Sequence, residues 1–243
     1  MEDSITNSGN SSSLLNSNLN SILTFIQINL KKSKLASANL IAFMVENNIK
    51  VALIQEPWVR NEKIKGLNHK EFVIIYKAIP GTNPRSCILI HKSITAFIIS
   101  NFSDADTTVI KIEGVDMPIT VVSAYFHGDL DIPTVKMVEL VESLNLQDSS
   151  KTNTDVLMGF DANARSELWG SSELNDRGEL LTDFIIKHNL VICNRGRTPT
   201  FTFPPGENSE GWSEVLDVTL TSNSDRLKVN GWEVSRDNSY SVS

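Results

Sequence analysis

Several polar side chains follow apolar segments of the sequence, at the points where those segments end. In DVLMGFDANARSELWG, residues 155–170, an apolar run stops at Gly159 and is followed by Asp161 and Asn163. Residues two apart in an extended chain face the same way, so this pair is expected to point into one cleft. The other polar residues in such positions are Asn29 after LTFIQI, Glu56 after VALIQ, Tyr125 after ITVVSA, and Asp217 within EVLDVTL.

This combination of side chains indicates one kind of chemistry. A carboxylate together with carboxamides favours a hard cation such as Mg²⁺, which takes oxygen ligands and keeps much of its water. A second carboxylate at a distance suits a general base, and a carboxamide can donate to a phosphate oxygen without adding negative charge. The set therefore predicts metal-assisted hydrolysis of a phosphate ester. Asp161 would handle the attacking water, and Asn163 would hold the scissile phosphate.

Strands and helices must place these residues at one edge of a sheet. The segment 33–48 predicts a helix that begins at Ser33 and buries Leu40, Ile41, Met44 and Val45. Two more helices are expected over 132–146, with Pro133 in the first turn, and over 175–189. Strands are expected at 22–30, 50–58, 71–78, 85–92, 94–102, 107–114, 118–126, 155–160, 190–194, 199–203, 214–222 and 228–235. This order predicts an α/β fold, a four-layer sandwich of two mixed β-sheets flanked by helices.

Composition sets limits on the domain and its partners. The chain has 243 residues, 40% of them hydrophobic, which suffices for one sizeable core over residues 21–243. Residues 1–20 are rich in Ser and Asn and are expected to form a disordered tail. The net charge of −7 argues against broad electrostatic binding of nucleic acid, although a local basic rim or bound metal ions could still attract it.

The cysteines and the hydropathy pattern indicate the compartment. Cys87 and Cys193 lie far apart in apolar runs and are expected to be buried thiols in a reducing environment. No apolar stretch is long enough to span a membrane, and no secretory signal is visible at the N-terminus. We therefore expect an intracellular protein without a membrane partner.

Seven short motifs occur in a fixed order over nearly everything after residue 20. They are FIQINLKKSK, LIQEPW, VSAYF, GFDANARSELWG, NDRGELLTDFI, TPTFTF and EVLDVTLTS. In this order they resemble the endonuclease domain of non-LTR (LINE-like) retrotransposons, which belongs to the endonuclease/exonuclease/phosphatase superfamily and is similar to apurinic/apyrimidinic endonucleases. The QEPW and WG…NDRG pieces point to retroelement nucleases rather than to lipid phosphatases or deadenylases.

The resemblance implies a nuclear enzyme that uses Mg²⁺, or Mn²⁺, to nick target DNA beside the reverse transcriptase domain of the intact element. Glu56 would be a metal ligand with Asn29 beside the metal, and Tyr125 would contact the phosphate or the leaving group. Asp217 would orient a catalytic histidine. Residues implied near the DNA are Lys31, Lys32, Asn175 and Arg177. The plainer interpretation of Asn175 and Arg177 is that they start a helix.

The sequence departs from the family at one motif, Ser-Asp-His after a Trp-x-Val strand. The strand matches GWEVS at 231–235, and Ser241 matches the serine, but Val242 and Ser243 stand at the Asp and His positions. An alternative register puts Asp237 and Asn238 there and shortens the loop after Trp232. Loss of a general acid/base group typically costs ~10²–10⁴-fold in rate. We therefore expect impaired activity and a missing final strand, and the alternative function is a catalytically dead, degenerate or co-opted DNA-binding module.

Overall fold

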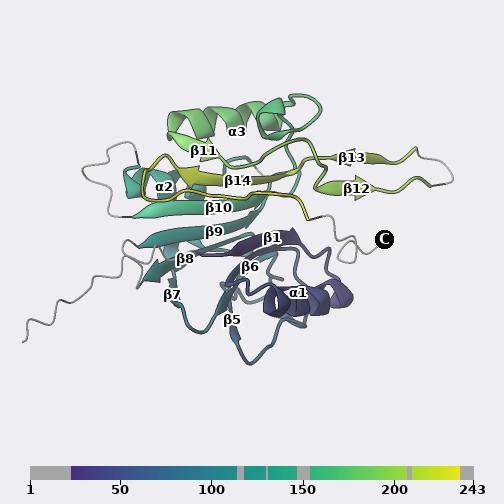
Figure 1. Cartoon of the computed structure of the whole chain (residues 1–243), viewed down its shortest axis with the longest axis vertical. Coiled ribbons are helices and arrows are strands. Elements are labelled where there is room, and N and C mark those ends of the chain that lie inside the picture. Colours follow the sequence, from purple (N-terminus) through teal and green to yellow (C-terminus); the bar gives the residue numbers. More distant parts are fainter. Residues whose placement is uncertain (1–22, 114–117, 130, 147–153, 207–209, 236–243) are drawn as a thin grey trace, which may run out of the picture.

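The computed structural model describes residues 23–113, 118–129, 131–146, 154–206 and 210–235, which form two mixed sheets (Figure 1). The expected tail at 1–20 lies outside the described residues. The positions discussed for the Ser-Asp-His motif, Asp237 to Ser243, and the final strand also lie outside them.

The first sheet has four strands in the order β1-β2-β6-β5. Their bounds are β1 (Phe25–Asn29), β2 (Val51–Gln55), β5 (Phe72–Ile75) and β6 (Ser86–His91). Strands β1 and β2 are parallel, and helix α1 (Lys34–Glu46) makes the crossover between them. Asn29 is paired with Gln55, so Asn29 and Glu56 end neighbouring strands at the same edge.

The second sheet has six strands in the order β11-β14-β10-β9-β8-β7. Their bounds are β7 (Thr95–Ile98), β8 (Thr107–Glu113), β9 (Ile119–Tyr125), β10 (Asp155–Asp161), β11 (Leu190–Ile192) and β14 (Asp217–Ser222). The register places Asp161 opposite Tyr125 on one side and opposite Asp217 on the other. Three of the candidate residues therefore lie abreast across three adjacent strands.

Short elements complete the chain. Two hairpins are formed by β3 (Val59–Arg60) with β4 (Lys63–Ile64) and by β12 (Phe201–Phe203) with β13 (Trp212–Glu214). The β12–β13 hairpin projects beyond the body of the molecule (Figure 1). Single 3₁₀ turns occur at η1 (Ser100–Phe102) and η2 (Glu167–Trp169).

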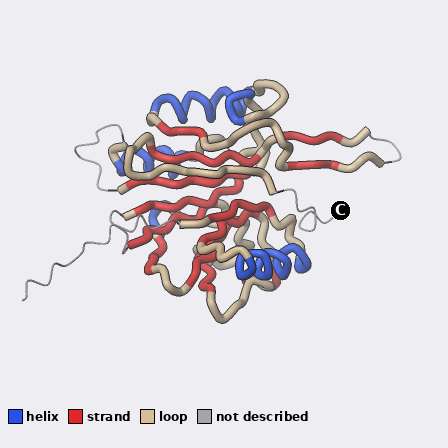
Figure 2. Tube along the Cα trace, in the orientation of Figure 1, coloured by secondary structure: helices blue, strands red, loops and turns tan. Residues whose placement is uncertain are grey.

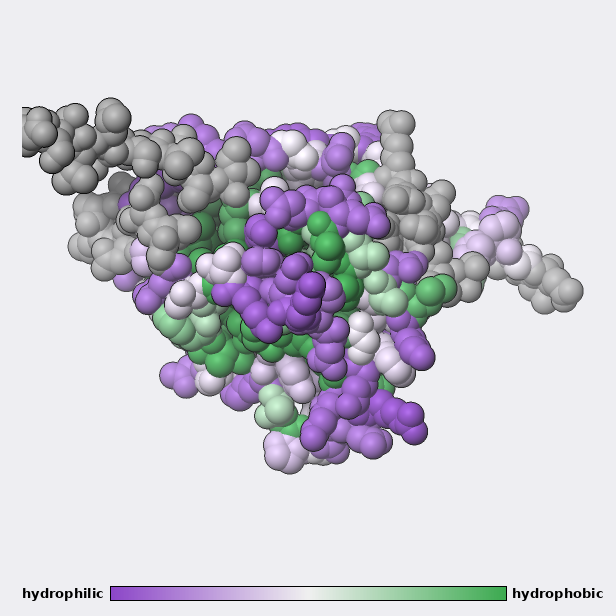
Figure 3. All heavy atoms as spheres, turned by 60° about the horizontal axis from the view of Figure 1, so that its bottom comes forward, coloured by the Kyte–Doolittle hydropathy of each residue, from purple (hydrophilic) through white to green (hydrophobic). Residues whose placement is uncertain are grey.

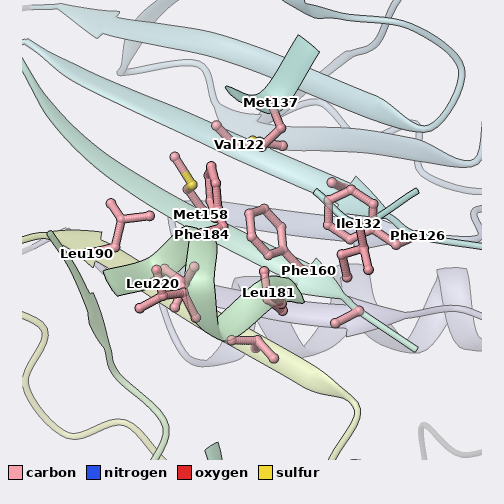
Figure 4. Close-up of a cluster of buried hydrophobic side chains, with 14 of the residues drawn as sticks. Val122, Phe126, Ile132, Met137, Met158, Phe160, Leu181, Phe184, Leu190 and Leu220 are labelled. Carbon is pink, nitrogen blue, oxygen red and sulfur yellow. The ribbon is translucent and has the colours of Figure 1, made fainter. Parts of the chain in front are cut away.

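Three buried clusters show how the layers pack. The cluster between the sheets includes Val51, Leu53, Ile88, Ile110 and Val121. A second cluster joins the first sheet to α1, and a third joins the second sheet to α2 (Val135–Leu144) and α3 (Asp176–Lys187). Figure 2 shows the stacked strands with helices on the outside, and Figure 4 shows side chains of the third cluster pointing toward one another. The predicted four-layer sandwich is confirmed.

Most predicted helix starts are confirmed, with corrections in detail. Ser33 caps α1 by accepting from Ala36 N, and Asn175 caps α3 by accepting from Gly178 N. Pro133 does not lie in the first turn of α2, because Thr134 is its N-cap and the proline comes before it. Val45 is 45% exposed, so the buried face of α1 is narrower than expected.

The strand expected at 228–235 is not formed. Gly231 adopts a φ of 67°, which interrupts an extended chain. Residues 227–232 nevertheless pack on the body. Leu227 and Val229 contact the cluster between the sheets, and Trp232 Nε1 donates to Thr219 Oγ1 at 3.1 Å. These contacts explain the apolar residues of the segment, although it forms no strand.

Both cysteines are free and buried, as their apolar surroundings in the sequence predict. No helix in the described part of the chain is long and apolar enough to cross a membrane. Figure 3 brings the side of the first sheet forward and shows hydrophilic residues gathered over much of it, with hydrophobic residues between them.

Candidate active site

Asn29 joins the two sheets at their shared edge. Its Nδ2 donates to Asp161 Oδ2 at 2.6 Å in the second sheet and lies 3.2 Å from Glu56 Oε2 in the first. Its Oδ1 accepts from Lys31 N at 2.8 Å. Three residues predicted from separate motifs are therefore brought into direct contact.

Glu56 is held in an uncommon backbone conformation. Its φ is 45°, in the left-handed region, which is costly for a residue with a side chain and is frequent at functional sites. Glu56 N donates to Arg85 O at 2.8 Å, and Glu56 O accepts from Lys32 N at 2.8 Å. Lys32 Nζ also lies 3.1 Å from Glu56 Oε1, so this carboxylate already forms an ion pair with an ammonium group.

Asp161 is the most perturbed carboxyl group of the site. It is only 8% exposed, and its Oδ1 has no hydrogen-bond partner in the structure. Burial raises its pKa well above the usual range, and the nearby charge of Asp217 raises it further, while the hydrogen bond from Asn29 partly offsets both. A carboxyl group that exchanges its proton near neutral pH suits a general base, and the unpartnered Oδ1 leaves one of its acceptors free.

Gln27 supports this carboxylate cluster and was missed by sequence reasoning. Its Nε2 donates to Phe160 O at 2.9 Å and to Asp217 Oδ1 at 3.2 Å, and its Oε1 accepts from Thr219 Oγ1 at 3.1 Å. A Cβ at Gly159 would come within 2.7 Å of Gln27 Oε1, so that glycine leaves room for the amide. The available signal was a polar residue inside an apolar strand, two positions before Asn29 and therefore on the same face.

Asp217 is ordered by these contacts. Burial raises its pKa, while hydrogen bonds from Thr200 and Gln27 and the charge of Lys31 lower it. Lys31 itself is exposed and places Nζ 5.1 Å from the centre of the Phe201 ring in the β12–β13 hairpin. The acidic cluster thus has a lysine from the β1–α1 loop beside it.

Tyr125 contributes a neutral hydrogen-bond donor. Burial and then the charges of Glu56 and Asp161 raise its pKa to about 12, so the phenol keeps its proton at neutral pH. The ring of His127 lies 6.3 Å from the Tyr125 ring, but His127 Nδ1 is 3.3 Å from Asp129 Oδ2 and the side chain is exposed. These contacts place His127 at the surface rather than in the cleft.

Asn163 does not follow the geometry expected for it. The chain leaves the strand after Asp161, and Asn163 has a φ of 46°, so the same-face rule for extended chain is wrong here. Its Nδ2 donates to Phe126 O at 3.1 Å, and its backbone N–H lowers the pKa of the Asp161 carboxyl group. The residue remains beside Asp161 through the backbone, and a phosphate contact of its side chain stays a prediction.

Arg177 and Asn175 make internal contacts at the start of α3. Asn175 Oδ1 accepts from Arg165 N at 3.0 Å and from Gly178 N at 2.8 Å. Among the described residues, Arg177 donates to the backbone carbonyl oxygens of Phe126, Gly128, Ala162 and Asn163. The plainer interpretation describes both residues well, and DNA contact by either stays a prediction.

Replacing Arg177 by Met is expected to lower the free energy of unfolding by about 2–3 kcal/mol, because it leaves the partly buried carbonyls of Ala162 and Asn163 without the guanidinium donor. The guanidinium fastens the loop after β9 to the loop after β10, so both loops should also become easier to cleave by protease. Urea denaturation measures the first effect. Arg197→Met, at an exposed position, should change stability by less than about 0.5 kcal/mol, and an equal loss in both variants would contradict the assignment.

A divalent cation has few but suitable ligands here. The described residues contain no group of three or more His, Cys, Asp or Glu side chains placed to hold a metal ion. The oxygen atoms at this place are the Glu56 carboxylate, the unpartnered buried Oδ1 of Asp161, and the Asn29 amide oxygen, which accepts from Lys31 N while Nδ2 faces the two carboxylates. A sparse set of oxygen atoms fits Mg²⁺, which keeps several waters in proteins.

A two-sheet sandwich with carboxylates and amides gathered at one edge is the arrangement of the endonuclease/exonuclease/phosphatase superfamily. Residues 119–241, just over half of the chain, match the family model described as endonuclease-reverse transcriptase. The protein belongs to this family. The predicted relation to retrotransposon endonucleases is thereby confirmed.

Two individual relatives support the same family assignment. The chain is 23% identical over 236 residues to the putative 115 kDa protein in the type-1 retrotransposable element R1DM of Drosophila melanogaster, covering 91% of this chain and 22% of that protein. It therefore spans about a fifth of that relative's length. The solved endonuclease domain of TRAS1, a telomere-specific non-LTR retrotransposon, is similar with a TM-score of 0.67 and 26% identity over 82% of this chain and 84% of that one.

A more distant structure shows the fold alone. The mannosyl-6-phosphatase Bt3783 of Bacteroides thetaiotaomicron has a TM-score of 0.51 at 12% identity, covering 84% of this chain and 86% of that one. The same sandwich thus supports different chemistries, and the function has to be argued from the site.

Proposed function

We propose that this protein is a Mg²⁺-dependent endonuclease that hydrolyses a phosphodiester to nick target DNA. The observation that carries the proposal is the pair of contacts from Asn29 Nδ2, which link Glu56 of one sheet to Asp161 of the other. Two carboxylates suited to phosphate hydrolysis are thereby each held within hydrogen-bond distance of one amide nitrogen.

The residues divide the chemistry among them. Asp161 takes the proton of the attacking water at its unpartnered Oδ1, and Asn29 keeps the carboxylate in place. Tyr125 donates its O–H to a phosphate or leaving-group oxygen, and Asn163 lies beside Asp161 to bind the phosphate. Mg²⁺ bound by Glu56 and Asn29, with Mn²⁺ as a substitute, would stabilise the charge that develops on the phosphate.

Charge near the site supports a DNA substrate. Lys31 and Lys32 follow Asn29 directly and are exposed, so their ammonium groups are accessible to backbone phosphates although the whole chain carries −7. We place the protein in the nucleus, next to a reverse transcriptase part of the same element, because target DNA and priming would both be required there.

Nicking of supercoiled plasmid tests the proposal. We expect Mg²⁺-dependent nicking that is lost with a chelator and reduced about 10²–10⁴-fold in Glu56→Gln, which removes the ligand charge. The matched control is Glu62→Gln, because Glu62 is an exposed glutamate that shares the left-handed backbone, with a φ of 58°. Equal activity in the wild-type protein and Glu56→Gln would contradict the proposal.

The second candidate function is a DNA-binding module without catalysis. One observation that favours it is that Val242 and Ser243 stand at the Asp-His positions of the family. Another is that the Glu56 carboxylate is already paired with the Lys32 ammonium group. A folded protein that binds labelled duplex DNA at low salt, yet leaves plasmid intact at every Mg²⁺ concentration, would establish this function instead.

A further inference from the structure

Arg85 lies where strand ends from both sheets meet, next to the site, and its side chain has no role in the proposed function. It immediately precedes β6, and its N–H donates to Ala105 O at 2.6 Å, in the segment that leads into β8. Its carbonyl oxygen accepts from Glu56 N at 2.8 Å. The backbone of Arg85 thus holds the left-handed turn that presents Glu56.

The side chain of Arg85 reaches the second sheet. Its Nε donates to Asp106 Oδ1, and its Nη2 donates to Asp106 Oδ2 at 2.7 Å, which is a two-pronged pair. The guanidinium carbon lies 5.8 Å from the centre of the Tyr125 ring. Asp106 also accepts from Tyr125 N, at 2.9 Å through its carbonyl oxygen.

The partner carboxylate is itself fixed. Asp106 N donates to Asp104 Oδ1 at 3.0 Å, and Asp104 Oδ2 lies 3.0 Å from Lys136 Nζ at the start of α2. The Arg85 and Asp106 side chains are 35% and 19% exposed, so water competes only partly for their pairing. A chain of polar contacts therefore runs from α2 through Asp106 to Arg85.

We infer that Arg85 is a positioning residue for Tyr125: held by Asp106, its guanidinium lies over the phenol ring in a cation–π contact and orients the hydroxyl toward the Glu56–Asp161 pair. The inference rests on the proposed function, since it assigns Arg85 a part in how Tyr125 serves that reaction. A ring contact with a simultaneous two-pronged carboxylate contact requires the planar guanidinium, which lysine lacks.

A double-mutant cycle on nicking tests the inference. Arg85→Met should lower kcat about 10-fold or more with little change in KM, because a displaced catalytic group mainly loses rate. In a Tyr125→Phe background the same substitution should change kcat by less than about 2-fold, since its effect passes through the phenol. Arg85→Lys should resemble Arg85→Met. An equal loss in both backgrounds would overturn the inference.

A second measurement does not depend on activity. In protein labelled with 3-fluorotyrosine, the ¹⁹F resonance of Tyr125, assigned by its loss in Tyr125→Phe, should shift in Arg85→Met and in Asp106→Asn. The control is Arg226→Met, which removes a guanidinium 3.3 Å from Asp155 at the other end of β10 and should leave the resonance in place.

The two readouts separate the two proposals. If the wild-type chain does not nick, the proposed function fails, and the ¹⁹F shift alone decides whether Arg85 orients Tyr125. An unchanged Tyr125 resonance in a folded Arg85→Met protein overturns the inference, whether or not the wild-type protein is active.

Discussion

Replacing Asp161 by Asn is expected to abolish nicking and, at neutral pH, to make the protein more stable. The activity should fall by at least about 10²–10⁴-fold, because an amide cannot take the proton of the attacking water. The stability should rise because the native state holds this carboxyl group buried, beside Asp217 and with one oxygen unpartnered. An uncharged amide of the same shape relieves that cost.

The pH dependence follows from the direction of the pKa shift. The folded state raises the pKa of Asp161 above its usual 3.8, so the folded state binds this proton more tightly than the unfolded chain does. The contribution of this protonated group to stability is complete below the usual pKa of 3.8 and is lost as the pH rises through the pKa of the folded state. The stability advantage of Asp161→Asn should therefore be small near pH 4 and reach about 1–3 kcal/mol above neutral pH.

The matched control lies on the same strand. Asp155 begins β10, is 2% exposed, and is satisfied by Ser222 Oγ at 3.0 Å and Arg226 Nε at 3.3 Å. Asp155→Asn should therefore lower stability and leave nicking nearly unchanged. Thermal unfolding in chelator between pH 4.5 and 8 measures both variants. A destabilised Asp161→Asn at pH 8 would show that its carboxylate is a structural group.

The strand ends of the site were predictable from two simple rules. The first is that an apolar run marks a buried strand, which identifies β1, β2, β9 and β10. The second is that the polar residue at the end of the run, or directly after it, lies at the edge of the sheet. Asn29, Glu56, Tyr125 and Asp161 were found in this way. The resemblance to a known family then implied that these residues share one site, which periodicity alone does not show.

Contacts made by side chains from other parts of the chain were not predictable. Gln27 and Arg85 reach partners far away in sequence, and neither follows a strand end, so their pattern is that of ordinary polar residues. The left-handed turn at Asn163 was equally hidden, because asparagine occurs in extended and left-handed chain alike. Geometry of this kind depends on which loops pack together.

The same limit applies to the residues implied at the DNA. Sequence motifs gave Lys31, Lys32, Asn175 and Arg177 as one group, but their surroundings differ. The two lysines are exposed, whereas Asn175 and Arg177 hold backbone groups around the start of α3. Packing at the start of α3 thus explains the NDRG motif without any DNA contact. Its glycine, Gly178, provides the sharpest test of this explanation.

Replacing Gly178 by Ala is expected to lower the free energy of unfolding by about 3 kcal/mol or more, the cost of severe overpacking. An ideal Cβ at this position would lie 1.7 Å from Arg165 O and 2.7 Å from Arg165 C, which are backbone atoms that no rotamer change can move. The direction of this change is informative, because replacing Gly by Ala inside a helix normally raises the free energy of unfolding by about 1 kcal/mol.

The clash also connects stability to the site. The α3 start and the loop after β10 are joined by Asn175 N to Arg165 O at 3.2 Å and by Arg165 N to Asn175 Oδ1. A methyl group between them would push away the loop that carries Asn163, so the variant that still folds should also nick more slowly. Gly128→Ala is the control, because nothing lies within 4 Å of its added Cβ and its φ lies outside the left-handed region. If urea denaturation shows Gly178→Ala to be as stable as Gly128→Ala, the close packing of α3 on this loop is wrong, and with it the reason for a glycine in the NDRG motif.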